Sequence, residues 1–478
     1  MAKTIRTTGK KETRRSSSKV APVKAKKAFS NYKEALAYLL DRTDYEKEER
    51  VRYNVTTFSL ERMERLLSLL GDPHTKINTV HIAGTKGKGS TATMLAKMLE
   101  ANGYTVGLYT SPHLVHLHER IAINSQMISE AEMLEMMNRM YGPVEKLTKE
   151  GDPPTFFEIM TALAFTYFAD RRIDIGVIET GMGGRLDSTN VLLPIVVGIT
   201  SLSIDHKRQL GDTLDRIAME KAGVFKRGIP VVTVQQDPLA MNVLRAQSAA
   251  VKAPLSVTGT DIDFSFRFET SREHGPHTRI CLSTATSKFE HLRVPLHGRH
   301  QAINCGLALA LLDKLKSIGY QIDNDKSAEG LGSVILAGRM EMICEDPRVM
   351  IDGAHNAASI RALIHAIGQN IPYDSMVMIF GCNNDKDIPG MLAELQYGAD
   401  KVIFTRSNSV KAISPQELAD TYTELCGKMC QVANTLGEAL QLARSAVGRE
   451  DLICITGSFY LIGMAKIRFQ PHGVPVAS

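Results

Sequence analysis

The chain has few cysteines and no long apolar run, and both absences limit what it can be. Its seven cysteines among 478 residues are an odd, dispersed set, unlike a disulfide framework, and they fit a reducing compartment. No Cys-x-x-Cys pair is present, and Cys426 and Cys430 have no neighbouring histidine, so we expect no zinc site. No apolar run reaches the ~20 residues that span a bilayer, and no signal-peptide core is present. We therefore expect a soluble, cytoplasmic protein.

The first 27 residues also have almost no acids and few large apolar side chains. They hold ten basic residues and one acid, Glu12, a net charge of +9 against +5 for the whole chain. Such a composition predicts a disordered basic tail. Its role stays open between a solvated tail with weak affinity for nucleic acid, an organelle transit peptide and a specific binding arm. Import into an organelle through residues 1–27 is thus the alternative to a cytoplasmic location.

The rest of the chain alternates between buried strand patterns and helical patterns, which predicts an α/β fold with mostly parallel sheets. We expect strands at 78–82, 105–109, 173–179, 195–200, 349–352, 376–380, 401–404 and 452–456. We expect helices at 32–40, 60–70, 91–101 and 302–318. Residues 261–296 alternate apolar and polar side chains and predict short antiparallel strands. We predict a P-loop-type ATPase domain at 28–336 and a smaller Rossmann-like domain at 340–478.

The stretch TVHIAGTKGKGS at residues 79–90 combines a strand, a glycine-rich turn and the start of a helix. Backbone N–H groups and a helix N-terminus attract anions, and glycines let the backbone approach a phosphate. Lys88 adds a point charge, and the Ser90 hydroxyl suits phosphate or its magnesium. The spacing departs from G-x-x-x-x-G-K-[ST], because the first glycine would fall on Ile82 and Gly89 separates the lysine from the serine. The loop predicts phosphate binding, with a tight turn lacking a ligand as the alternative.

Two polar residues follow neighbouring strands of the predicted sheet. Glu179 ends one strand and precedes the glycine-dense stretch TGMGGRLD, and His206 follows the next strand. Ligands bind at the carboxyl edge of open α/β sheets, and Mg²⁺ prefers oxygen ligands. We interpret the pair as a metal or phosphate site, the alternative being a turn-capping acid and a structural histidine.

Three further residues indicate a functional site only when they are considered together with the other motifs. Lys221 falls near the C-terminal end of a predicted helix, where a surface lysine is the plain interpretation. Asp352 and His355 follow a predicted strand of the second domain, and they suggest a nucleotide or substrate contact.

Taken together, these motifs resemble the folylpolyglutamate synthase/dihydrofolate synthase family, within the wider Mur ligase superfamily. The shared stretches occur in the family's order between about residues 31 and 465: HIAGTKGKGS, GLYTSPHLVHLHERI, FFEIMTALAF, IETGMGGRLDSTNV, ITSLSIDH, LGDTLDRIAMEKAGVFK, AGRMEMI, MIDGAHN and ITGSFYLIG. The resemblance implies that ATP converts a carboxylate into an acyl phosphate and that the amine of glutamate attacks it, giving an amide, ADP and phosphate. Phosphoryl transfer needs alignment and charge neutralisation more than a protein nucleophile.

The resemblance also implies roles in the first domain. The residues that would hold the ATP phosphates are Gly87, Lys88, Gly89 and Ser90. The residues that would bind magnesium are Ser111, Glu179 and His206. Lys221 matches a family lysine that is carbamylated and so supplies a carboxylate-like group to a second Mg²⁺.

Four other roles carry over from the resemblance. Asn304 would contact the adenine base, and Arg339 and Asp352 would reach ATP from the linker and the second domain. His355 would orient the acyl phosphate or the incoming glutamate. Contacts from two domains imply closure on ATP, which keeps water from the acyl phosphate.

The sequence departs from the family pattern at a few positions. Ala357 stands where a proline is usual, Lys86 where an asparagine is frequent, and Lys207 where a threonine is frequent. None removes an implied ligand, so we expect an active enzyme.

The substrate is less defined than the reaction. Family members add the first glutamate to dihydropteroate, extend a tetrahydrofolate tail, or do both. No residue of this sequence decides between these activities, and we predict an enzyme with both. We also predict that it is a monomer and that the pterin contacts lie near residues 58–60. The alternatives are a Mur-type ligase for another acid and a non-catalytic ATP-binding protein that uses its basic tail.

Overall fold

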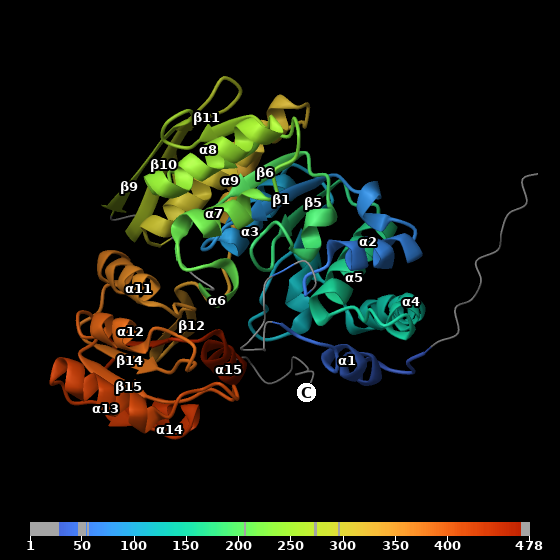
Figure 1. The fold of residues 1–478 in the computed structure, drawn as a ribbon. Coiled ribbons are helices and arrows are strands. Elements are labelled where there is room, and N and C mark those ends of the chain that lie inside the picture. The colour runs from blue at the N-terminus through green and yellow to red at the C-terminus, as the bar shows by residue number, and fades with distance from the viewer. Residues whose placement is uncertain are drawn as a thin grey trace, which may run out of the picture.

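The computed structural model describes residues 28–45, 54, 57–204, 207–271, 275–294 and 297–469, which form three β-sheets. The predicted disorder of residues 1–27 and the predicted ligand His206 lie outside these ranges. Figure 1 shows two units, one coloured blue to yellow and a smaller one coloured orange to red. The α/β class is confirmed, and the exact domain boundaries stay a prediction.

The larger unit is built on an eight-stranded sheet in the order β4-β3-β2-β5-β1-β6-β7-β8. Its parallel strands are β1 (Thr79–Ala83), β2 (Val106–Tyr109), β5 (Ile175–Glu179), β6 (Val196–Ile199), β7 (Val231–Thr233) and β8 (Leu255–Val257). The strands β3 (Ile121–Ile123) and β4 (Gln126–Met127) add an antiparallel edge that the sequence did not predict. The first β-strand has its neighbours on both sides, so the loop after it leaves the middle of the sheet, where α/β folds bind ligands.

Helices cover both faces of this sheet, because its central strands are apolar on both sides. Val80 and Ile82 of β1 pack with α3 (Lys88–Ala101) and α9 (Arg299–Ser317), and α10 (Asn324–Gly332) lies on α3. Ile178 of β5 faces the opposite core, which is formed by α1 (Tyr32–Leu40), α2 (Leu60–Leu69), α4 (Glu130–Lys149) and α5 (Phe156–Asp170). The helices α7 (Leu214–Ala222) and α8 (Pro238–Val251) cover the β6–β8 end, and the short α6 (Lys207–Leu210) precedes them.

The predicted antiparallel segment is confirmed as a three-stranded sheet in the order β11-β10-β9. Its strands are β9 (Asp263–Ser271), β10 (Gly275–Ser283) and β11 (Lys288–Val294). Ile280 and Leu282 of β10 point into the core shared with α9. Short 3₁₀ turns complete the unit: η1 (Pro73–Lys76), η2 (Leu117–Arg120) and η3 (Ser188–Val191).

The smaller unit is a doubly wound six-stranded sheet in the order β12-β13-β17-β14-β15-β16. Its strands are β12 (Glu341–Glu345), β13 (Arg348–Ile351), β14 (Met376–Phe380), β15 (Lys401–Phe404), β16 (Gln431–Val432) and β17 (Leu452–Thr456). One face is covered by α11 (Ala357–Asn370), α12 (Ile388–Leu395) and α13 (Pro415–Cys426), and the other by α14 (Leu436–Ser445) and α15 (Phe459–Phe469). All strands except β12 pair in parallel, as a Rossmann-like domain requires.

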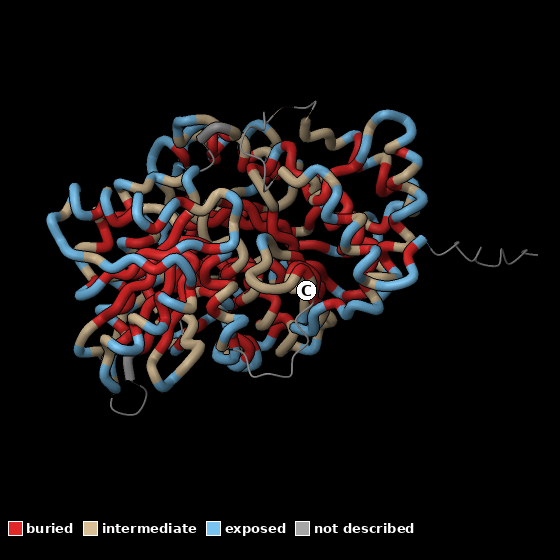
Figure 2. The backbone as a smooth tube through the Cα atoms, turned by 90° about the horizontal axis from the view of Figure 1, so that it is seen from below, coloured by how far each residue is buried: buried red, intermediate tan, exposed pale blue. Residues whose placement is uncertain are grey.

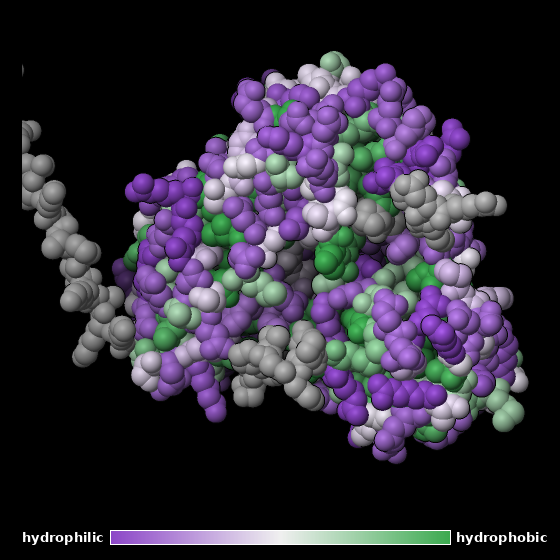
Figure 3. Space-filling model, turned by 180° about the vertical axis from the view of Figure 1, so that it is seen from behind, coloured by the Kyte–Doolittle hydropathy of each residue, from purple (hydrophilic) through white to green (hydrophobic). Residues whose placement is uncertain are grey.

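Burial follows this architecture. Figure 2 shows buried backbone through the middle of the molecule and exposed backbone along the outer helices and loops. The face in Figure 3 is mostly hydrophilic, with apolar side chains in small separate patches. Within the described ranges, no helix combines the length and the apolar character needed to cross a membrane.

Candidate active site

The glycine loop between β1 and α3 accepts no side chain at two positions. Gly84 has φ +147°, and a Cβ there would lie 1.8 Å from Thr200 Oγ1. Gly87 has φ +91°, and a Cβ there would lie 2.1 Å from Asn304 Oδ1. Both glycines are therefore required by backbone conformation and by close neighbours. Asn304, the predicted base contact, lies beside the phosphate loop.

Helix α3 begins at Lys88, three residues before the predicted start at residue 91. Glycines normally signal a loop, but here Gly87 is the N-cap and Gly89 lies in the first turn. Thr91 N–H donates to Gly87 O (2.9 Å), which starts the helical hydrogen bonding. The N–H groups of the first turn have no carbonyl partner within the helix, and Gly87 has no side chain to cap them. The helix start therefore presents N–H donors suited to a phosphate.

Glu179 lies at the end of β5, directly beside this helix start. Its carboxylate is buried, with Oε1 3.8 Å from Lys88 Nζ and Oε2 accepting a hydrogen bond from Ser111 N–H (3.1 Å). A Cβ at Gly89 would lie 3.2 Å from Oε2, so glycine lets the helix approach the carboxylate. Burial raises the pKa of Glu179, and the Lys88 ammonium, the Ser111 N–H and the Arg339 guanidinium oppose that rise. A second cation at this carboxylate would therefore stabilise its charged form further.

The residues predicted to bind magnesium are placed in part. Ser111 and Glu179 are in contact and offer hydroxyl and carboxylate oxygens, the donor type that Mg²⁺ prefers. His206 lies outside the described residues. In the part of the chain that the structure describes, no group of three or more His, Cys, Asp or Glu side chains has the arrangement of a metal site. The donor set fits magnesium, and the ligand assignment stays a prediction.

Lys221 is not a surface residue, so the plain interpretation of this lysine was wrong. It is 4% exposed, and its Nζ donates to Gly84 O (2.7 Å) at the start of the phosphate loop. The helix position did not reveal this, because only the packing of α7 against the loop buries the side chain. A carbamylated lysine keeps one N–H on Nζ, so this hydrogen bond is compatible with the predicted modification.

A buried polar chain supports the glycine-dense loop after Glu179. Asp187 accepts hydrogen bonds from Met182 N–H (2.8 Å) and Thr189 N–H (3.0 Å). The Thr189 hydroxyl lies 2.7 Å from His81 Nε2 in β1. Burial lowers the pKa of His81 to about 3, so the ring is neutral at ordinary pH. His81 was not predicted as a site residue, and its only signal in the sequence was a histidine inside an apolar strand.

Arg120 was also missed. This arginine is 1% exposed, and its Nε donates to His113 Nδ1 (2.9 Å) within the segment that begins at Ser111. Its guanidinium lies 5.3 Å from the ring centroid of Phe156, and its charge opposes the rise that burial causes in the pKa of Glu179. Burying a charged residue is costly, and the available signal was only an arginine directly before the apolar run 121–123.

The smaller unit presents Arg339 and Asp352 to the same site. The Asp352 carboxylate accepts hydrogen bonds from Met340 N–H (2.9 Å) and Ala354 N–H (2.8 Å). Burial raises the pKa of Asp352, and Arg339 is the largest opposing influence. The same guanidinium also opposes the rise at Glu179, so its charge acts on a carboxylate of each unit. Arg339 further packs over the Phe459 ring at 4.8 Å.

His355 faces the glycine loop across the gap between the units. Its Nε2 lies 3.1 Å from Lys86 Nζ, and its Nδ1 lies 2.7 Å from Gly353 O. A second contact joins the units where Leu114 packs on the core of the smaller unit, and a Cβ at Gly463 would lie 2.3 Å from Leu114 O. The structure thus brings the described candidates from both units to one region.

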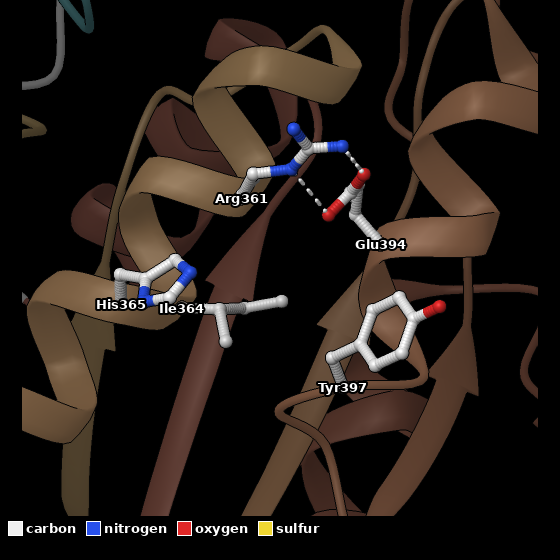
Figure 4. Close-up of a pocket in the computed structure, with 5 residues that line it drawn as sticks. All are labelled: Arg361, Ile364, His365, Glu394 and Tyr397. Atoms are coloured by element: carbon white, nitrogen blue, oxygen red, sulfur yellow. Dashed lines mark hydrogen bonds and ion pairs between the residues drawn. The ribbon is translucent and has the colours of Figure 1, made fainter.

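A shallow cavity of about 330 Å³ lies elsewhere in the smaller unit, between α11 and α12 (Figure 4). Its lining residues are Arg361, Ile364, His365, Glu394 and Tyr397. Arg361 and Glu394 point toward each other and form an ion pair, with Nε 3.0 Å from Oε2. None of the predicted site residues lines this cavity.

Two protein-family models match the chain. The Mur ligase middle domain matches residues 82–312, and the Mur ligase glutamate ligase domain matches residues 338–459. The dihydrofolate synthase/folylpolyglutamate synthase of Bacillus subtilis is 34% identical over 415 residues, which cover 86% of this chain and 95% of that relative.

Solved structures agree with these matches. Folylpolyglutamate synthase of Mycobacterium tuberculosis, complexed with ADP and AMPPCP, superposes with a TM-score of 0.81 at 33% identity, covering 86% of this chain and 96% of that chain. An FPGS complex with AMPPCP and folate has a TM-score of 0.78 at 31% identity, covering 92% and 100% of the two chains.

Proposed function

Because the chain belongs to the folylpolyglutamate synthase/dihydrofolate synthase family of the Mur ligases, we propose that it joins L-glutamate to the carboxylate of dihydropteroate or a folate. It is an ATP-dependent, amide-forming ligase. The observation that carries the proposal is the glycine loop with its buried Glu179, faced by Arg339, Asp352 and His355 from the second unit.

In the first step an oxygen of the substrate carboxylate attacks the γ-phosphorus of ATP, the bond to ADP breaks, and an acyl phosphate forms. The main requirement is neutralisation of the phosphate charge. The N–H groups of Gly87 to Ser90 and the Lys88 ammonium meet it at the start of α3. Ser111 and Glu179, with His206, would hold Mg²⁺, which when bound neutralises phosphoryl oxygens.

In the second step the amine of glutamate attacks the acyl carbon, the bond to the phosphate oxygen breaks, and the amine loses a proton. Arg339 and Asp352 reach the nucleotide from the second unit, and Asn304 contacts the base. His355 orients the acyl phosphate or the glutamate. Enclosure between the two units protects the acyl phosphate from water. Carbamylated Lys221 supplies a further anionic group beside the loop, and a carbamate signal in ¹³C NMR of the protein in ¹³C-bicarbonate, absent in Lys221→Met, would detect it.

The substrate range follows from the relatives. The Bacillus subtilis relative carries both activities in its name, and the AMPPCP complex also contains folate. We therefore propose a bifunctional enzyme that accepts dihydropteroate and tetrahydrofolate. A cytoplasmic location, a monomeric state and any role of residues 1–27 stay predictions.

The test is to incubate the full-length protein with Mg²⁺, ATP, glutamate and either dihydropteroate or tetrahydrofolate, measuring ADP release and product mass. A product one glutamate heavier with both acids supports a bifunctional enzyme, and a gain with only one acid narrows the proposal to that activity. AMPPCP binding without any glutamate addition would contradict the proposal and favour another acid substrate.

A further inference from the structure

Lys86 extends from the glycine loop to the second unit. Its backbone is fixed, because Lys86 N–H donates to Ser201 O (3.2 Å) and Thr85 N–H donates to the same oxygen (3.0 Å). Its ammonium lies 3.1 Å from His355 Nε2, although the two residues are 269 positions apart in the chain. Because its backbone is fixed in one unit and its ammonium contacts the other, the Lys86 side chain can hold His355 at a fixed distance from the glycine loop.

The contacts of His355 define its protonation state. Nδ1 lies 2.7 Å from Gly353 O, and a carbonyl oxygen only accepts, so Nδ1 carries a proton. A lysine ammonium only donates, so Nε2 accepts and carries no proton. We assign His355 to the neutral Nδ1–H form, with the lone pair of Nε2 directed at Lys86. Its backbone is held as well, since His355 N–H donates to Ser359 Oγ (3.1 Å) at the start of α11.

We propose that Lys86 is a positioning residue for the ligase reaction. It holds His355 neutral and at a fixed place opposite the phosphate loop, and so it couples the nucleotide site to the unit that receives glutamate. The shorter asparagine expected from the family resemblance could not make this contact from the same backbone position. The inference rests on the proposed function for its kinetic consequences, while the contact itself does not.

The kinetic test compares Lys86→Met, Lys86→Arg and the matched exposed control Lys149→Met on α4. We expect kcat of Lys86→Met to fall about 10-fold to 100-fold, as for a lost hydrogen bond to a charged group. KM for ATP should change little, because Lys88 and the helix start hold the phosphates. Lys86→Arg should recover part of kcat, and Lys149→Met should match wild type. Combining Lys86→Met with His355→Gln should lower kcat no further than His355→Gln alone.

A spectroscopic test needs no substrate. In protein with ¹⁵N,¹³C-histidine, the signal lost in His355→Gln should report the neutral Nδ1–H form in wild type. In Lys86→Met it should shift toward the doubly protonated form, because no ammonium then opposes a proton on Nε2 while Gly353 O still accepts from Nδ1–H. Unfolding curves of each variant check that the fold is retained. An unchanged His355 signal, additive effects in the double variant, or a higher KM for ATP with unchanged kcat would overturn the inference. If the wild-type protein adds glutamate to neither dihydropteroate nor tetrahydrofolate, the proposed function fails. The histidine signal still shows whether Lys86 contacts His355.

Discussion

The close fit between Gly87 and Asn304 can be isolated by a matched pair of alanine substitutions. Gly87 has φ +91° with Asn304 Oδ1 where a Cβ would be, and Gly103 has φ +89° with nothing within 4 Å of a Cβ. Alanine costs about 1–2 kcal/mol in this left-handed conformation. Gly103→Ala should therefore lower the free energy of unfolding by about that amount and leave AMPPCP binding unchanged.

Gly87→Ala carries the same strain and an added collision, because its Cβ would lie 2.1 Å from Asn304 Oδ1 and 2.7 Å from Asn304 Cγ. Overpacking adds about 1–3 kcal/mol, which brings the expected loss to roughly 2–5 kcal/mol. The loop must also shift, so AMPPCP should bind at least about tenfold more weakly, the equivalent of 1.4 kcal/mol.

Urea unfolding and calorimetric titration with AMPPCP measure both quantities in the same samples. Shortening the neighbour in Gly87→Ala/Asn304→Ala should recover the collision part of the stability loss and leave the part seen in Gly103→Ala. The reasoning fails if Gly87→Ala and Gly103→Ala lose equal stability and both bind AMPPCP like wild type.

Three further predictions concern buried charged or titratable groups. Glu179→Gln should lower turnover roughly 100-fold or more with an unchanged unfolding curve, as for loss of a charge-stabilising group. ADP release near the wild-type rate would contradict the prediction that Glu179 binds Mg²⁺. In the folded protein, Arg62 Nε lies 2.9 Å from Oε2 of the buried Glu158. Arg62→Met removes this guanidinium and should lower the free energy of unfolding, measured in urea, by about 3–5 kcal/mol. A decrease below about 1 kcal/mol would contradict this prediction. The pKa of His81 is about 3 in the folded protein and has its ordinary value of 6.5 in the unfolded chain. Between these pH values the unfolded chain binds more protons than the folded protein. The stability that comes from neutral His81 is therefore complete above pH 6.5 and is lost as the pH falls toward 3. Between pH 7 and pH 5, His81 should account for about 2 kcal/mol of lost unfolding free energy, and His81→Gln should show a correspondingly smaller pH dependence.

Much of the fold could be predicted because its strands are short apolar runs between helical patterns. The strands at 376–380, 401–404 and 452–456 occur where they were expected. The strands β3, β4, β7, β8, β12 and β16 were missed. All except β12 are only two or three residues long, β4, β8, β12 and β16 lie at sheet edges, and both residues of β4 are exposed. The early start of α3 was missed because its first residues are Lys88, Gly89 and Ser90, a composition typical of a loop.

The candidate site was predictable wherever a residue belongs to a local motif. The glycine loop around Lys88 and the acid Glu179 at a strand end were predicted from such motifs. The burial of Lys221 and the contact between Lys86 and His355 depend on tertiary packing, which spacing along the chain does not encode. The influence of Arg339 on carboxylates of both units depends on tertiary packing for the same reason.

The most direct test of the central claim follows one oxygen atom. The substrate, dihydropteroate or tetrahydrofolate, is labelled with ¹⁸O in the carboxylate that accepts glutamate and is turned over with ATP and glutamate. Released phosphate is then analysed by mass spectrometry. An acyl phosphate requires one ¹⁸O in each phosphate, because the carboxylate oxygen leaves with the phosphoryl group, and ADP should be unlabelled. Unlabelled phosphate, or label in AMP, would contradict the account.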